Sequence, residues 1–277
     1  MAILSDKDWT FFKQNGYVVV PNAVPQENLD AIIAGAFEFL EMKPTDREGW
    51  YREPLRTNGM VEMYHHQAMW NNRQHPRMHQ IFTEIWGTEK LWVSIDRVSF
   101  KPPPHPDHPE YDNKGFIHWD ANTKNLPLSF GVQGVLYLTD TVANQGGFQC
   151  IRGIHHKLTD FDADHPPDYE YYAPDLKQFK PQTIPGRAGD LLIWHRALAH
   201  GSSHNTSDNP RLAQYITMSP ARPENQEHLQ SRIRLWKDRQ PPSSPAFPGD
   251  PRQWEKGRPP AELTSLGRKL LGLDAWD

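Results

Sequence analysis

The chain has 277 residues, 37% of them hydrophobic, which is enough for one sizeable core. Its net charge is −4 and no run of Lys or Arg forms a basic stripe, so we expect neither nucleic acid nor a membrane surface as a partner. The single cysteine, Cys150, excludes an internal disulfide. The N-terminus lacks the profile of a signal peptide, and no apolar stretch approaches membrane-spanning length. We therefore expect a cytoplasmic protein.

Residues up to about 90 predict helices with one strand between them. Apolar residues such as Leu29, Ile32 and Phe37 recur at helical spacing, which indicates a helix with one face on a core. Pro25 suits the first turn of that helix. In order, we predict a helix over 5–16, a strand over 17–20, a helix from about 25 to 40, an irregular segment over 43–73 and a helix over 75–86.

From residue 91 onward the apolar pattern changes to a period of two, which is typical of strands. A strand over 92–101 would place Arg97, Ser99 and Lys101 on one face. Glycine and proline turns separate further predicted strands over 115–119, 130–138, 148–151, 191–194 and 212–218.

Helices followed by many strands favour an α+β fold with a barrel or sandwich core. Residues 157–180 form a long insertion with several tyrosines, which we interpret as a lid. After Ala221 the chain is polar and rich in proline until a predicted amphipathic helix over 260–271. Because no repeat or linker interrupts the chain, we predict one domain over 1–277, with a C-terminal extension over 222–277.

The triplet His118-Trp119-Asp120 is the strongest chemical feature of the sequence. In a strand, residues two apart point to the same face, so His118 and Asp120 can bind one ion. His200 follows an apolar run and could supply a third ligand from a neighbouring strand. Two imidazoles and one carboxylate leave three positions open on an octahedral ion, which suits non-haem Fe(II). The triplet alone is weak evidence, because a chain with 14 histidines contains such triplets by chance.

The residues around His200 strengthen this interpretation. A turn at Gly189-Asp190 leads into a buried strand, and Arg211 follows His200 by 11 residues at the start of another strand. A buried arginine needs a carboxylate partner. If the protein supplies none, the carboxylate of a ligand is the natural candidate.

Over roughly residues 5 to 220 the chain resembles the phytanoyl-CoA dioxygenase family of Fe(II)- and 2-oxoglutarate-dependent oxygenases, which includes ectoine hydroxylases. The resemblance is clearest in Val98–Pro103, His118–Asp120, Gly147–His155 and Gly189–Arg211.

The resemblance implies a double-stranded β-helix, a jelly-roll or cupin-like barrel, with the N-terminal helices packed on the outside. It implies that His118, Asp120 and His200 are the catalytic iron ligands. Arg211 would bind the distal carboxylate of 2-oxoglutarate, assisted by Ser202, while Ser99 occupies a position that often touches this cosubstrate. With O2 as the second cosubstrate, the reaction would hydroxylate or otherwise oxidise an unactivated C–H of a small molecule, releasing succinate and CO2.

The sequence departs from the family pattern near the expected substrate pocket. Ile154 stands where a serine is common, and Gln133 and Val135 stand where a tryptophan is common. We expect a small polar or anionic metabolite as substrate, and we list Arg97, Gln133 and Tyr137 as candidate contacts. For Arg97 an alternative is an ion pair with an acidic neighbour.

Other interpretations of the same residues remain open. A zinc hydrolase can use the same ligand types, although its usual helical His-Glu-x-x-His motif is missing. A barrel that only binds a ligand is a non-enzymatic alternative. A halogenase would carry a small residue in place of Asp120. His195 is a rival third ligand, but it lacks the following Gly-Ser and the spacing to Arg211. The sequence does not indicate an oligomeric state.

Overall fold

A computed structural model describes residues 2–164, 169–172 and 175–276. The α-helices are α1 Asp6–Asn15, α2 Gln26–Leu40, α3 Gln67–Arg73, α4 Pro76–Trp86, α5 Leu158–Ala163, α6 Gln226–Asp238 and α7 Ser265–Leu271. The strands are β1 Tyr17–Val20, β2 Met60–Val61, β3 Leu91–Val93, β4 Val98–Lys101, β5 Val132–Tyr137, β6 Phe148–Cys150, β7 Gln182–Thr183, β8 Leu191–His195, β9 His200–Ser202, β10 Arg211–Tyr215 and β11 Met218–Pro220.

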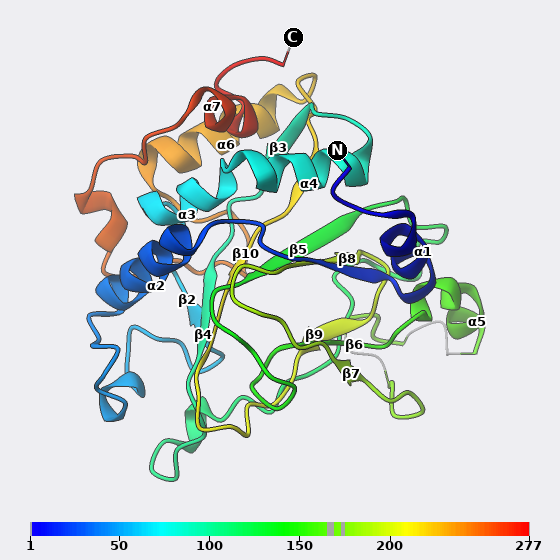
Figure 1. Cartoon of the computed structure of the whole chain (residues 1–277), viewed down its shortest axis with the longest axis horizontal. Helices are drawn as coiled ribbons and strands as arrows, with labels where there is room; N and C mark the ends of the chain where they lie inside the picture. Colours follow the sequence, from blue (N-terminus) through cyan, green and yellow to red (C-terminus); the bar gives the residue numbers. More distant parts are fainter. Residues whose placement is uncertain (1, 165–168, 173–174, 277) are drawn as a thin grey trace.

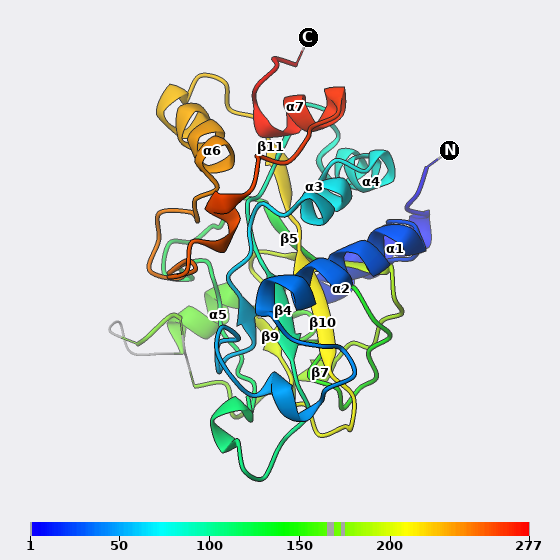
Figure 2. The same cartoon turned by 90° about the vertical axis from the view of Figure 1, so that its left-hand side faces the viewer.

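The strands form antiparallel sheets. The large sheet has the order β1-β8-β5-β10-β4-β2, a smaller one the order β7-β6-β9, and β11 pairs with β3. Helices α2 and α3 lie on one side of the large sheet, and α5 lies on the other (Figures 1 and 2). The predicted α+β class is therefore confirmed, and its sheets are antiparallel.

Both faces of the large sheet are buried. Along each strand, alternate side chains point toward the helices on one face and toward the three-stranded sheet on the other. On β10, Leu212 packs in the cluster shared with the helices, while Ala213 packs in a second cluster with the β6 residues Phe148 and Cys150. Tyr137 belongs to that second cluster as well. Side chains of the second set face the interior between the two sheets, which is where a site can be enclosed.

Several N-terminal predictions are confirmed with their boundaries. Ser5 caps α1 in a capping box with Asp8, and Gly16 ends the helix in the left-handed conformation with φ 81°. Strand β1 covers the predicted residues, α2 begins after Pro25, and α4 begins after His75.

Other predicted boundaries are wrong. The predicted strand over 92–101 is two strands, β3 and β4, because the Asp96 carboxylate accepts the backbone N–H of Arg97 and interrupts the ladder. The predicted strand over 212–218 is likewise divided between β10 and β11. The predicted strand over 115–119 pairs only at His118. The segment over 43–73, expected to be irregular, contains α3 and β2.

The C-terminal extension is more ordered than its composition indicates. It contains α6, which the sequence analysis missed, and α7, which is shorter than the predicted helix over 260–271. Arg232 is the only fully buried residue of α6, and its apolar residues Leu229, Ile233 and Trp236, although at helical spacing, are partly buried in a mostly polar segment. Part of the predicted lid over 157–180 forms α5, and its residues 165–168 and 173–174 lie outside the described part of the chain. No helix in the described residues is long and apolar enough to cross a membrane.

Candidate metal and cosubstrate site

His118, Asp120 and His200 come together at one point between the two sheets. One ligand atom from each lies within 4.8 Å of the others. The Nε2 atom of His118 is 3.3 Å from Oδ1 of Asp120, and Nε2 of His200 is 3.6 Å from Oδ2. Adjacent ligands of an octahedral ion with bonds of about 2.1 Å are roughly 3 Å apart. The donor set and its spacing therefore fit a first-row metal ion.

Backbone pairing explains why a histidine 82 positions away in sequence reaches the triplet. His118 and His200 form an antiparallel bridge, with N–H to carbonyl distances of 2.9 and 3.0 Å in the two directions. Gly201 permits this approach, because a Cβ atom there would lie 1.8 Å from the carbonyl oxygen of Phe116. The neighbouring Trp119 points away, with its indole N–H donating to the Ala197 carbonyl at 2.9 Å.

The environment prepares His200 and Asp120 for metal binding. The Nδ1 atom of His200 lies 2.9 Å from the Leu198 carbonyl, a contact that orients the ring so that Nε2 faces Asp120. Partial burial alone would raise the pKa of Asp120. Hydrogen bonds from His118, His200 and Gln133, with the charge of His200, lower the pKa well below its usual range. Asp120 is therefore a carboxylate at neutral pH, and 44% of its side chain is exposed.

A set of buried donors without an acceptor lies on β10 and β4. Arg211 is 2% exposed, and its Nε and Nη1 atoms have no hydrogen-bond partner. No carboxylate of the described residues lies within 4.0 Å of this guanidinium. The hydroxyl of Ser99 is also buried and unpartnered. These orphaned polar atoms fit an anionic ligand that the chain itself does not provide.

Lys101 is a buried cationic side chain next to these atoms, and its role was not predicted from the sequence. It pairs directly with Arg211 across β4 and β10, so both side chains lie on the inward face. Its ammonium group donates to the hydroxyl of Ser202. Burial, and next the charge of Arg211, lowers the pKa of Lys101 to about 7. The available signal was a lysine at an inward position of a buried strand, two residues after Ser99.

The three candidate substrate contacts have protein partners. Gln133 donates to Asp120 at 2.7 Å, and the Tyr137 hydroxyl donates to the Ile184 carbonyl at 2.7 Å. Arg97 forms an ion pair with Glu62 at 2.9 Å. The structure thus provides the acidic neighbour that was one of the two interpretations of Arg97.

The rival histidines lie outside the cluster. His195, at the end of β8, contacts the rings of His155 and Phe130, and burial lowers its pKa to about 4. His155 and His156, which follow the turn at Gly153, both hydrogen-bond the Lys13 carbonyl near the end of α1.

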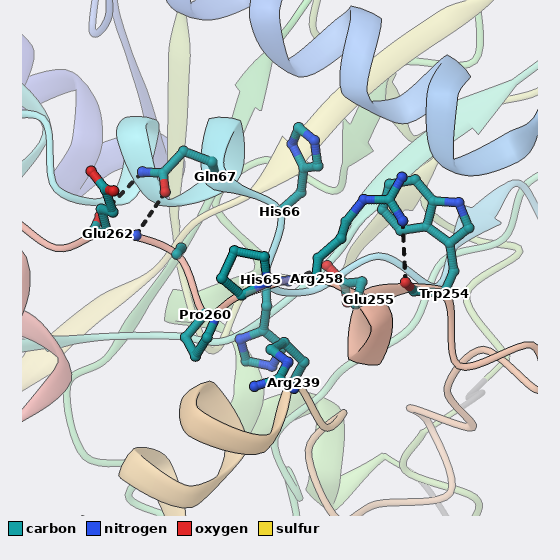
Figure 3. A pocket seen from close by; sticks show the side chains of 11 residues that line it. His65, His66, Gln67, Arg239, Trp254, Glu255, Arg258, Pro260 and Glu262 are labelled. Carbon is teal, nitrogen blue, oxygen red and sulfur yellow. Dashed lines mark hydrogen bonds between the residues drawn. The ribbon is translucent and has the colours of Figure 1, made fainter.

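A separate cavity of about 450 Å³ lies between the loop before α3 and the C-terminal segment (Figure 3). Its polar groups are largely engaged already. Gln67 exchanges two hydrogen bonds with the backbone of Glu262, and Arg258 pairs with Glu38 at 2.7 Å. None of the metal-site residues lines this cavity, so we assign the chemistry to the His118–Asp120–His200 cluster.

Comparison with known proteins agrees with this geometry. The family model "Phytanoyl-CoA dioxygenase (PhyH)" matches residues 12–213. A putative phytanoyl-CoA dioxygenase of Dictyostelium discoideum is 22% identical, with 81% of this chain and 78% of that protein covered. Ava biosynthesis cluster protein O of Aspergillus versicolor is 24% identical, with 81% of each covered.

Solved structures share the fold. A hypothetical protein from Escherichia coli has a TM-score of 0.72 at 17% identity, covering 98% of this chain and 82% of its own. The non-heme alpha-ketoglutarate-dependent epimerase SnoN from nogalamycin biosynthesis has a TM-score of 0.57 at 20% identity, covering 78% and 80%. The chain belongs to the phytanoyl-CoA dioxygenase family and is a non-haem iron oxygenase that depends on 2-oxoglutarate.

Proposed function

We propose that His118, Asp120 and His200 bind Fe(II) and that the enzyme oxidises an unactivated C–H of a small polar or anionic metabolite. The main support for the proposal is the convergence of these three ligand atoms, together with the buried Arg211, whose Nε and Nη1 atoms have no partner. We further propose that the whole chain is one oxygenase domain, with the two main sheets as the halves of a double-stranded β-helix.

The cosubstrate would lie between the metal ligands and the inward faces of β4 and β10. Arg211 and Lys101 would neutralise the distal carboxylate of 2-oxoglutarate, and the hydroxyls of Ser202 and Ser99 would donate to it. Fe(II) bound at the triad would then activate O2 as 2-oxoglutarate is converted to succinate and CO2. The residues of the chain supply placement, since the C–H held close to the metal is the one oxidised.

Aromatic side chains flank the metal site on its exposed side. The rings of Phe116 and Tyr172 lie 4.6 and 5.2 Å from that of His118, and both side chains are about half exposed. We propose that these two rings form the border of the opening through which the substrate enters. The related solved structures include an epimerase and a carbocyclase, so we propose C–H oxidation without restricting its outcome to an alcohol.

An anaerobic titration of the metal-free protein with Fe(II) and 2-oxoglutarate tests the proposal. We expect a saturable visible charge-transfer band from the chelate, and its loss in Asp120→Ala through weakened iron binding. With O2 and candidate metabolites, succinate release then identifies substrates. A protein that binds Zn(II) tightly but gives no band with Fe(II) and 2-oxoglutarate would favour the hydrolase alternative, and one that binds neither metal would favour a ligand-binding barrel.

A further inference from the structure

Gln133 and Trp194 form a short hydrogen-bonded relay that ends on the metal-binding carboxylate. The two residues are directly opposite each other in the β5–β8 register. The Trp194 indole N–H donates to Oε1 of Gln133 at 3.1 Å, and Nε2 of Gln133 donates to Oδ2 of Asp120 at 2.7 Å. Trp194 is 3% exposed, and its ring lies 4.8 Å from that of His200.

The orientation of the Gln133 amide follows from the chemistry of its two neighbours. An indole N–H can only donate a hydrogen bond, so it selects the amide oxygen. The amide nitrogen must then face Asp120, whose carboxylate can only accept. Trp194, on the large sheet, packs against Phe148 at 4.9 Å and against His200, so two rings of the three-stranded sheet hold it in place.

The two oxygens of Asp120 consequently have different surroundings. Both oxygens face a histidine, Oδ1 at 3.3 Å from Nε2 of His118 and Oδ2 at 3.6 Å from Nε2 of His200, but only Oδ2 also accepts the short hydrogen bond from Gln133. A carboxylate that used both oxygens would occupy two of the six positions of an octahedral ion. Two histidines and the two donor atoms of 2-oxoglutarate would fill the rest and leave none for O2.

We propose that Gln133, held by Trp194, is a positioning residue that restricts Asp120 to binding the metal through one oxygen and so keeps the O2 position open. The inference rests on the proposed function, since it assumes that Asp120 is an iron ligand. It also gives Gln133 a role other than substrate binding. Its amide already donates one N–H to Asp120 and accepts from Trp194, so only the second N–H remains to donate to a substrate.

Two variants break the relay at different points. Gln133→Met keeps the length of the side chain but removes its donor. Trp194→Phe keeps a ring against His200 but removes the N–H that orients Gln133. The matched control is Trp86→Phe on helix α4. It also removes an indole hydrogen bond, the one that Trp86 donates to the Met218 carbonyl at 2.8 Å.

The measurement is an anaerobic titration of each Fe(II)–2-oxoglutarate protein with nitric oxide, which occupies the O2 position and gives an EPR signal. We expect both relay variants to keep the charge-transfer band and the 2-oxoglutarate KM, while nitric oxide affinity and kcat fall about tenfold or more. The control should match the wild type. Wild-type nitric oxide affinity in both relay variants would overturn the inference, whereas a missing charge-transfer band in the wild type would overturn the proposed function instead.

Discussion

Two buried basic side chains, Arg211 and Lys101, face each other across β10 and β4 with no carboxylate in contact among the residues that the structure describes. A buried charge without a counter-charge costs several kcal/mol in real proteins. A fold tolerates this arrangement at a site whose ligand provides the missing charge. The two residues together therefore support the proposed 2-oxoglutarate site more strongly than either residue alone.

Arg211→Met should weaken 2-oxoglutarate binding and leave iron binding unchanged. A hydrogen bond to a charged group contributes about 1.5–3 kcal/mol, which corresponds to roughly ten- to hundredfold in affinity. The 2-oxoglutarate KM from succinate release and the Fe(II) dissociation constant are the two quantities to compare. Arg234→Met, an exposed arginine of α6, is the control. A wild-type KM in Arg211→Met would remove this residue from the cosubstrate site.

Lys101 should link 2-oxoglutarate binding to proton uptake. Burial lowers its pKa from 10.5 to about 7, so the free protein loses this proton as the pH rises through 7. A bound carboxylate raises the pKa again, so binding above pH 7 must restore the proton. We expect affinity to fall as the pH rises from 7 to 9, by at most about tenfold per unit.

Calorimetry of 2-oxoglutarate binding at pH 8, in buffers of different ionisation enthalpy, measures this proton directly. Lys101→Met should bind more weakly and show a flatter pH profile. Proton uptake that is the same in Lys101→Met as in the wild type would assign the effect to another group.

At the scale of elements, the site depends on a close approach between β9 and the segment before Trp119. Gly201→Ala places a methyl group 1.8 Å from a backbone oxygen, that of Phe116, which no side-chain rotation can relieve. We expect the His118–His200 bridge to open and Fe(II) affinity to fall at least tenfold. Gly257→Ala, where a Cβ meets nothing within 4 Å, is the matched control. An unchanged Fe(II) dissociation constant in Gly201→Ala would show that the bridge does not position the ligands.

Some elements of the site could be predicted from the sequence and others could not. The spacing of His118 and Asp120 and the position of Arg211 at the start of a strand are local features that the sequence shows, although His118 forms an isolated bridge instead of the predicted strand. The partners of Lys101 and Gln133 depend on register between strands distant in sequence, which periodicity does not encode. Helix α6 was not predicted, although Leu229, Ile233 and Trp236 recur at helical spacing, because most of its residues are polar or charged.

At the scale of the whole molecule, the C-terminal extension is packed into the same core as the N-terminal helices. Leu270 and Leu271 are fully buried in a cluster that also contains Leu29 and Phe82. Figures 1 and 2 show α6 and α7 at the same end of the molecule as α3 and α4. This continuity supports our proposal that the chain forms a single domain, although the family model ends at residue 213.

A substitution of Arg232 can test whether the chain forms a single domain. Its guanidinium donates to the carbonyls of Val93, Leu270 and Leu271, at 2.6, 3.1 and 3.3 Å, and so joins α6, α7 and β3. Arg232→Met keeps the apolar stem but leaves these buried carbonyls without this donor. We expect a loss of roughly 2–4 kcal/mol in the free energy of unfolding, or about 5–10 °C in Tm.

The control is again Arg234→Met, two positions along the same helix and exposed. A single domain requires the melting transition of Arg232→Met to stay cooperative and to shift as a whole, as monitored both by far-UV circular dichroism and by loss of the Fe(II)–2-oxoglutarate band. If the C-terminal helices instead melted separately while the band persisted, the extension would be an accessory unit and the single-domain proposal would be wrong.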